Sequence, residues 1–544
     1  MRLTVVPLAL AMVAIAACAS TPTGHNAAPV TTALINVPAI THPQGETAAW
    51  WYRAGAARAA GNGAMAGKAK NVIVFLGDGM SLTTVAAARI LEGQRGGSSG
   101  EENSLAFERF PHTALSKTYN TDYQTPDSAG TMTAIATGAK TRLGLVGVGQ
   151  GVARGDCAGT RDHELLSFIE LAESAGLRTG LVTTARLTHA TPASTYAHLP
   201  DRSWESDANL SPGASAEGCT DIAAQLIESP FGDGPEVLLG GGRAAFLPVT
   251  TTDAEYADQT GKRTDGRDLV AEWRTRHPRG HYAWNASQLA ATGEATALFG
   301  LFEPSHMQYE GDRAGDHGGE PSLAELTATA IRMLQAEGPG FVLLVEGGRI
   351  DHGNHEGNAR RALEETVALS DAVRVAESLT SESETLLLVT ADHAHTLHFA
   401  GYPRRGNAIL GKVSGKTSEG SEDRPLALGR DGRSYTTLGY ANGPGAVPAE
   451  GPRPDLQHVD TTARGYQQQS LVPLPSETHG GEDVGVWARG PGADAVRGSV
   501  EQNVLYHFIV QATPALRARL CAAGTCNEDG VPVELPRPED FKSK

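Results

Sequence analysis

Basic residues are scarce in this chain relative to acidic ones. Its 544 residues include 45 Lys and Arg against 62 Asp and Glu, so the formal net charge is −17. A surface of this sign repels polyanions, because binding to a nucleic-acid backbone depends on patches of Lys and Arg. The composition therefore argues against nucleic-acid binding. An enzyme with an anionic substrate stays possible if bound metal ions reverse the field locally.

Apolar runs of membrane-spanning length are lacking as well. The N-terminal run from Leu3 to Ala17 follows Arg2, ends in small residues and is too short to cross a bilayer. This pattern is typical of an export signal over residues 1–17. The charged residues 536–544 exclude a glycolipid anchor at the C-terminus. We therefore expect an exported protein in the periplasm or at the cell surface.

Cys18 indicates how the exported chain is held. The stretch from Ile15 to Cys18 resembles a bacterial lipobox, in which the cysteine is the lipid-modified first residue of the mature protein. Residues 18–48, rich in Thr, Ala and Pro, are then a tether between the lipid anchor and the folded domain. The alternative is a cleaved signal peptide with an incidental cysteine.

Cysteine is rare, with five residues in the chain. With Cys18 assigned to lipid, the other four form an even set in an oxidising compartment, so disulfides are expected. Cys521 and Cys526 enclose only four residues and pair most simply with each other, which leaves Cys157 with Cys219. A zinc site is the competing interpretation of four cysteines, but the chain has no Cys-x-x-Cys pair.

Apolar runs alternate with amphipathic stretches from about Trp50 onward. The runs Asn71–Leu76 and Phe341–Val345 are continuous, which is typical of strands buried on both faces. Residues 362–376 have helical periodicity and precede a further run, Thr385–Val389. The alternation predicts an α/β fold with a doubly wound, mostly parallel central sheet flanked by helices.

One large catalytic domain is the expected organisation. It spans residues 49–515, and polar stretches at about 245–320 and 402–478 interrupt its pattern and have the character of insertions. Residues 516–544 form a C-terminal tail closed by the predicted disulfide.

Carboxylates and imidazoles follow the predicted strands, where a doubly wound sheet gathers its functional groups. Asp78 follows the first strand, Glu346 follows Val345, and Asp392 with His393 follows the run that ends at Val389. Carboxylate oxygens suit magnesium, and mixed His and carboxylate sets suit zinc. The spacing therefore predicts a cluster of metal ions.

Two further motifs leave alternatives open when each is taken alone. Asp351 and His355, four residues apart, would share one helix face and reach one ion, or Asp351 caps a helix and His355 is solvated. Asp127 and Ser128 precede an apolar run that predicts a helix, whose N-terminus favours an anion. A simple helix cap is the alternative there.

Taken together, these motifs closely resemble the alkaline phosphatase family, and they occur in the family's order. The matching segments are residues 75–80, 125–131, 345–356, 390–395 and 477–483, and residues 401–407 are similar to animal-type members. The resemblance runs from about residue 50 to about 515. It implies a crown-like insertion, hydrolysis of phosphate monoesters with broad specificity, and a homodimer with residues 402–478 and the segment near Trp50 at the interface.

The resemblance also implies two zinc ions and one magnesium ion per subunit. One zinc ion has Asp351, His355 and His479 as ligands, the second has Asp78, Asp392 and His393, and magnesium has Asp78, Thr191 and Glu346. The mechanism then has two in-line displacements through a phosphoserine, and Ser128 is the nucleophile of the first. Arg202 is the residue that grips two phosphate oxygens, which a guanidinium does bidentately.

Other residues follow from the animal-type members. His189 and His352 stand near magnesium and phosphate, where some bacterial members carry an acid and a Lys. A structural cation, calcium, is implied on Glu255, Glu303, Glu320 and the backbone carbonyl of Phe302. Surface glutamates of a strongly acidic protein are the alternative to this fourth site.

Two rival functions remain to be weighed. A sulfatase or phosphodiesterase would use the same scaffold, but a sulfatase needs a Cys/Ser-x-Pro-x-Arg motif, whereas Ser128 is followed by Ala-Gly-Thr-Met. A non-catalytic, metal-holding surface lipoprotein is the other rival. The intact nucleophile, arginine and metal-ligand sets argue against it.

Overall fold

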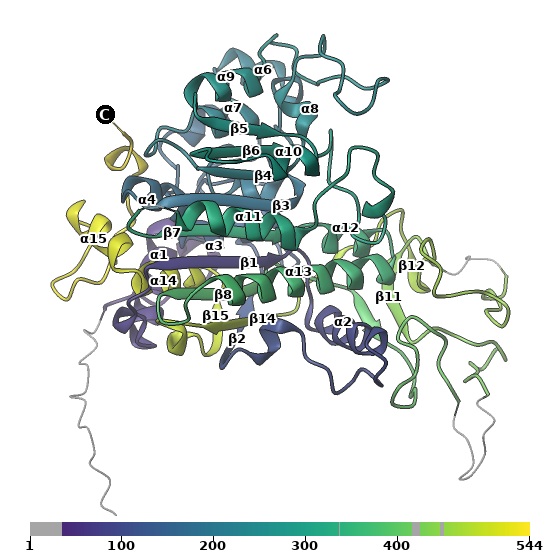
Figure 1. Cartoon of the computed structure of the whole chain (residues 1–544). Coiled ribbons are helices and arrows are strands. Elements are labelled where there is room, and N and C mark those ends of the chain that lie inside the picture. The colour runs from purple at the N-terminus through teal and green to yellow at the C-terminus, as the bar shows by residue number, and fades with distance from the viewer. Residues whose placement is uncertain (1–34, 337, 416–424, 447–450, 544) are drawn as a thin grey trace, which may run out of the picture. The chain divides into compact units, whose positions relative to one another are not determined.

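The computed structural model describes residues 35–336, 338–415, 425–446 and 451–543 (Figure 1). Cys18, the predicted export signal and much of the predicted tether lie outside the described residues. Within the described part of the chain, no helix is both long and apolar enough to cross a membrane.

A ten-stranded sheet forms the centre, in the order β15-β2-β14-β8-β1-β7-β3-β4-β6-β5. Strand β14 pairs antiparallel with both of its neighbours, and all the other pairs in this sheet are parallel. The mostly parallel sheet predicted from the apolar runs is therefore confirmed. Its strands are β1 (Asn71–Gly77), β2 (His112–Lys117), β3 (Arg178–Arg186), β4 (Val237–Gly241), β5 (Gly280–Ala283), β6 (Ala297–Leu301), β7 (Phe341–Gly347), β8 (Thr385–Ala391), β14 (Val484–Arg489) and β15 (Gly498–Glu501).

Helices cover both faces of this sheet (Figure 1). The longer ones are α1 (Ala48–Gly61), α2 (Leu82–Arg95), α3 (Ser128–Thr137), α9 (Leu269–Arg276), α11 (Leu323–Gln335), α13 (Ala359–Leu379), α14 (Val504–Ala512) and α15 (Pro514–Ala522). The short ones are α4 (Phe168–Ser174), α5 (Ala190–Ala193), α6 (Pro212–Ala216), α7 (Ile222–Ile227), α8 (Arg243–Phe246), α10 (Ala286–Ala290) and α12 (Arg349–His355).

The side chains of β1 explain why its sequence is continuously apolar. Successive residues of a strand point to opposite faces of the sheet. Val72 and Val74 belong to one core cluster with residues of α1, α3, α4 and α14, whereas Ile73 and Phe75 belong to a second cluster with residues of α2, α11 and α13. Both faces of the strand are therefore buried, as in a doubly wound sheet.

The two polar stretches differ in their contribution to the fold. Residues 245–320 carry β5 and β6, which extend the main sheet at its edge, so this stretch is not only an insertion. Strand β5 is four residues long and mostly half-buried, so it lacks the apolar run that marks the inner strands. The second stretch supports a small sheet of β10 (Leu397–Phe399), β11 (Leu438–Gly443) and β12 (Ser470–Pro473).

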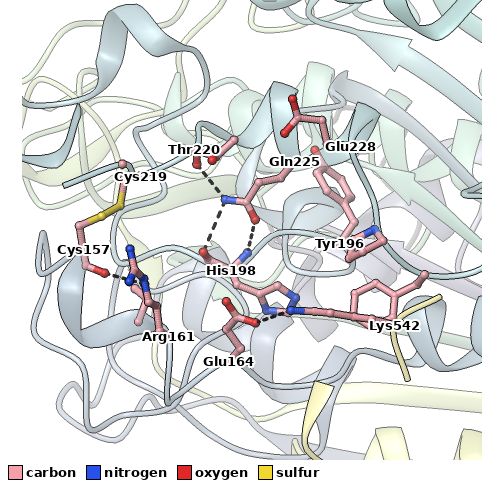
Figure 2. A pocket seen from close by; sticks show the side chains of 14 residues that line it. Cys157, Arg161, Glu164, Tyr196, His198, Cys219, Thr220, Gln225, Glu228 and Lys542 are labelled. Carbon is pink, nitrogen blue, oxygen red and sulfur yellow. Dashed lines mark hydrogen bonds and ion pairs between the residues drawn. A yellow bond between two sulfur atoms is a disulfide. The ribbon is translucent and has the colours of Figure 1, made fainter. Parts of the chain in front are cut away.

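Both predicted disulfides, Cys157–Cys219 and Cys521–Cys526, are present. The first borders a polar pocket of about 260 Å³ that is lined in part by Glu164, His198 and Lys542 (Figure 2). Lys542 Nζ lies 3.5 Å from Glu164 Oε2, so the C-terminal segment packs against the loop that this disulfide closes. None of the predicted metal ligands lines this pocket.

Candidate active site

The predicted carboxylates meet at the carboxyl edge of β1, β7 and β8. These three strands are neighbours in the sheet, with β1 in the middle. Asp78 directly follows β1, Glu346 is the last residue but one of β7, and Asp392 directly follows β8. All three side chains are fully buried. The parallel register therefore brings together Asp78 and Asp392, which are far apart in the sequence, with Glu346 beside them.

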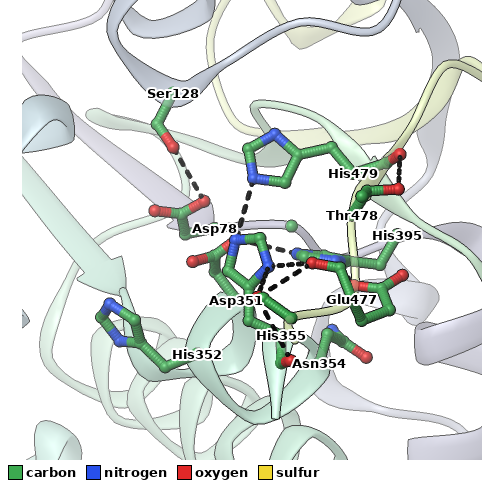
Figure 3. Close-up of polar contacts among 12 residues, drawn as sticks. Asp78, Ser128, Asp351, His352, Asn354, His355, His395, Glu477, Thr478 and His479 are labelled. Atoms are coloured by element: carbon green, nitrogen blue, oxygen red, sulfur yellow. Dashed lines mark hydrogen bonds and ion pairs between the residues drawn. The ribbon is translucent and has the colours of Figure 1, made fainter. Parts of the chain in front are cut away.

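Asp351 and His355 lie on one face of helix α12, as their spacing predicts (Figure 3). His355 Nε2 lies 3.3 Å from Asp351 Oδ1, and His479 Nε2 lies 3.4 Å from the same oxygen. The alternative in which Asp351 caps the helix is wrong, because the helix begins at Arg349 and its N-cap is Gly348. The structure thus brings the first predicted ligand set together.

The second predicted set shares Asp78 with the third. His393 Nε2 lies 3.3 Å from both Asp78 Oδ1 and Asp392 Oδ2. Asp78 also forms a group with Glu346 and His189 whose candidate ligand atoms lie within 4.8 Å of one another. Thr191 Oγ1 donates to Asp78 Oδ2 at 3.4 Å. Asp78 therefore stands between two groups, which its two carboxylate oxygens allow.

Two residues of the site were missed by the sequence analysis. His395 Nε2 lies 2.8 Å from Asp351 Oδ1, and its Nδ1 lies 2.5 Å from Glu477 Oε2. His395 belongs to β9 (Ala394–His395), which pairs with β13 (His479–Gly480) and sets His395 opposite His479. The repeat of histidine at positions 393 and 395 was the signal available for His395. Glu477 had none.

Ser128 is the first residue of α3, and Asp127 is its N-cap. Ser128 Oγ lies 3.1 Å from His393 Nε2 and 3.5 Å from Asp78 Oδ1. The helix cap is therefore present, and it places Ser128 against the carboxylates.

Asp127 also fixes Arg202. The carboxylate accepts from the backbone N–H of Gly130 at 3.1 Å and from Arg202 Nη1 at 3.1 Å. Arg202 Nη2 donates to His189 Nε2 at 3.2 Å. The guanidinium is thus held from two sides beside the N-terminus of α3.

The charges of this cluster call for cations. Burial raises the pKa of Asp78 well above its ordinary value and raises the pKa of Glu346 to about 8. Glu346 Oε1 is buried without a hydrogen-bond partner. Burying several carboxylates together is costly unless cations compensate them. The donor set of carboxylates and imidazoles therefore fits divalent metal ions.

A second acidic group lies in residues 245–320. Candidate ligand oxygens of Glu255, Glu303 and Asp316 lie within 4.8 Å of one another. Glu320 is not in this group, and its two oxygens accept from the backbone N–H of Gln308 at 3.1 and 3.0 Å. Asp316 was not singled out in the sequence, since it lies four residues before the expected ligand. Phe302 is buried next to Glu303.

A doubly wound sheet with buried carboxylates, imidazoles and a helix-capped serine at its carboxyl edge defines a metal-binding hydrolase. The profile described as alkaline phosphatase matches residues 69–515 of this chain. The chain therefore belongs to the alkaline phosphatase family, and the prediction of an enzyme of this family is confirmed.

Curated relatives support the assignment over most of the length. The tissue-nonspecific alkaline phosphatase of Rattus norvegicus is 45% identical over 453 residues, which cover 82% of this chain and 84% of the relative. An alkaline phosphatase of Gadus morhua is 45% identical over 453 residues and is covered to 92%. The solved alkaline phosphatase of Thermus thermophilus has 26% identity and a TM-score of 0.58, with 82% of this chain and 92% of that chain covered.

We predict that Asp127→Ala impairs both stability and phosphate binding. Loss of the cap should lower the free energy of unfolding by about 1 kcal/mol. Loss of the hydrogen bond to Arg202 should raise the KM for p-nitrophenyl phosphate by about 10-fold. Chemical denaturation and steady-state kinetics measure the two effects.

Asp268→Ala is the matched control. Asp268 caps α9 and accepts from Ala271 N at 2.9 Å, far along the chain from the cluster. It should lose similar stability at unchanged KM. Equal KM values for Asp127→Ala and the unmodified chain would contradict the role of Asp127 in holding Arg202.

Proposed function

We propose that this chain hydrolyses phosphate monoesters to an alcohol and inorganic phosphate, with broad specificity and through a phosphoserine at Ser128. The observation that carries the proposal is the position of Ser128 Oγ. It lies at the N-terminus of α3, within 3.5 Å of His393 and Asp78, with Arg202 held close by through Asp127.

The cofactors in this proposal are two zinc ions and one magnesium ion. Asp351, His355 and His479 would hold one zinc ion, Asp78, Asp392 and His393 the other, and Asp78, Thr191 and Glu346 the magnesium ion. When bound, these ions lower the pKa of the serine hydroxyl and offset the charge of the attacking and leaving oxygens. The buried, unpartnered Glu346 Oε1 supports a cation at the third site.

The chain's own residues account for the remaining steps. Ser128 Oγ releases its proton to solvent and forms a bond to phosphorus, while the bond from phosphorus to the alcohol oxygen breaks and that oxygen takes up a proton from solvent. Arg202 holds two phosphoryl oxygens, and the free N–H groups of α3 favour the anion. Water then loses a proton and attacks phosphorus from the same side as the departed alcohol, and the Ser128 oxygen leaves and regains its proton.

Replacing Ser128 by Ala tests this proposal. Removal of the nucleophile should lower the release of p-nitrophenol from its phosphate by several orders of magnitude. A chelator should abolish the activity of the unmodified chain, and mass spectrometry of acid-quenched enzyme should find phosphate on the Ser128 peptide.

Ser116→Ala is the matched control for this test. Ser116 is fully buried in β2, and its Oγ has no hydrogen-bond partner, so its loss should leave turnover unchanged. Undiminished turnover in Ser128→Ala would reject the phosphoserine mechanism. A sulfatase or phosphodiesterase would instead prefer sulfate or diester substrates in the same assay.

We also propose that calcium binds Glu255, Glu303 and Asp316, with the carbonyl of Phe302 as a further ligand. Burial, together with the neighbouring carboxylates of Glu255 and Asp316, raises the pKa of Glu303 to about 7. Such a site would join the segments that carry Glu255 and Asp316 to the end of β6 through Glu303. It would stabilise the fold by mass action, about 2.7 kcal/mol at 100 times Kd.

Thermal unfolding across a calcium titration separates the possible ligands, with zinc and magnesium held constant. Calcium should raise the Tm of the unmodified chain and of Glu320→Gln, because Glu320 contacts Gln308 instead. Asp316→Asn should lose most of this rise. Equal calcium-dependent shifts in Asp316→Asn and the unmodified chain would exclude the site.

We propose a homodimer that uses the small sheet of β10, β11 and β12. Its surface exposes Leu471, Val472 and Phe399, with 80%, 48% and 42% of each residue accessible. Large apolar side chains exposed on one small sheet favour a protein partner. Sedimentation should show a dimer for the unmodified chain and a monomer for Leu471→Glu. Leu428→Glu, also at an exposed position but outside these strands, should stay dimeric. A monomeric unmodified chain contradicts this assembly.

Export and lipid attachment at Cys18 complete the proposal, with the enzyme in the periplasm or at the cell surface. Membrane contact is then confined to the anchor. The mass of the mature N-terminal peptide tests this, because an unmodified cysteine or a cleavage site beyond residue 18 excludes the anchor.

A further inference from the structure

Three histidines lie together beside the candidate active site. The ring centroids of His306 and His352 are 4.1 Å apart with 59° between the ring planes. Those of His306 and His189 are 5.4 Å apart at 77°, and those of His189 and His352 are 5.6 Å apart. His306 therefore contacts both histidines that were placed near magnesium and phosphate. None of the ligand sets proposed above includes it.

Each of the three imidazoles accepts a hydrogen bond from a different arginine. Arg186 Nη1 donates to His306 Nε2, Arg202 Nη2 to His189 Nε2 at 3.2 Å, and Arg349 Nη1 to His352 Nδ1 at 3.5 Å. A guanidinium can only donate, so the accepting nitrogen of each ring carries no proton. Each ring is thus neutral, with its proton on the other nitrogen.

The surroundings keep the rings in this state. Burial, followed by His352 and Arg186, lowers the pKa of His306, and burial lowers the pKa of His352 to about 3. Three guanidinium groups around this histidine cluster, His189, His306 and His352, also repel any further cation. The cluster is therefore unsuited to hold a metal ion of its own, and its contacts serve to position its members.

A residue outside the histidine cluster holds Arg186, the donor that fixes the tautomer of His306. Arg186 is held by Glu205, which accepts from Arg186 Nε at 2.7 Å and from Nη2 at 2.6 Å. Glu205 also accepts from Thr188 Oγ1 at 2.6 Å, one residue before His189. One carboxylate thus holds both the donor to His306 and the backbone that carries His189.

His306 belongs to the segment Glu303–Tyr309, which follows β6, and the other two histidines of the cluster come from other elements. Tyr309 of the same segment lies under the guanidinium of Arg349, 3.7 Å from the ring centroid. The segment therefore contacts His352 through His306 and contacts Arg349, the partner of His352, through Tyr309.

We propose that His306 is a positioning residue, which holds His352 and His189 in place and, through His189, orients Arg202 for phosphate. This inference rests on the function proposed above. Removing the imidazole leaves a gap against His352 and an unpaired N–H on Arg186. His189 is then free to turn, and Arg202 loses a fixed acceptor.

Measurements of binding test this role without relying on turnover. His306→Ala, loaded with zinc, should bind inorganic phosphate about 10-fold more weakly by isothermal titration calorimetry, and magnesium more weakly by equilibrium dialysis. Its Tm should change no more than that of the control. His306→Gln keeps an acceptor for Arg186 without the ring, and it replaces His306→Ala in both measurements if that variant does not fold.

His281→Ala is the matched control, because His281 is also half-buried in residues 245–320 and bonds only a backbone carbonyl, that of Gln288. It should bind phosphate and magnesium as the unmodified chain does. Unchanged phosphate and magnesium affinities in the folded His306 variant overturn the positioning role. Absence of p-nitrophenyl phosphate hydrolysis by the unmodified chain instead overturns the proposed function, and the positioning role with it.

Discussion

The burial of Asp78, Glu346, Asp351 and Asp392 at one edge of the sheet is the constraint on which the other features depend. Carboxylates this close repel one another and lose their hydration, so the fold has to supply compensating groups from every direction. Imidazoles arrive from α12, from the end of β8 and from the distant β13. The adjacency of β1, β7 and β8 makes this possible, because the three strands end side by side at one edge of the sheet.

Much of this arrangement follows from local sequence. Buried strands such as β1 and β8 are recognisable in the sequence as continuous apolar runs. The polar residues that follow them have to lie at the carboxyl edge of a parallel sheet. The four-residue spacing of Asp351 and His355 fixed their common helix face in the same way. The pairing of Cys157 with Cys219 came by elimination, since the other two cysteines are close neighbours.

Other features depend on contacts that no local pattern encodes. His395 and Glu477 meet across the β9 and β13 pair, 82 residues apart, and His306 joins two histidines from other elements. Strand β5 was not predicted from the sequence, because it is short and only half-buried. Asp316 lies near Glu255 and Glu303 in the acidic group, four residues before Glu320, and no local pattern in the sequence indicates this contact.

The seven residues of the segment Glu303–Tyr309 contribute side chains to three separate sets of contacts. Glu303 belongs to the acidic group, His306 belongs to the histidine cluster, and Tyr309 contacts Arg349. Adding or deleting one residue there would shift at least one of these side chains out of place. In the evolution of such chains, this stretch should therefore keep a constant length.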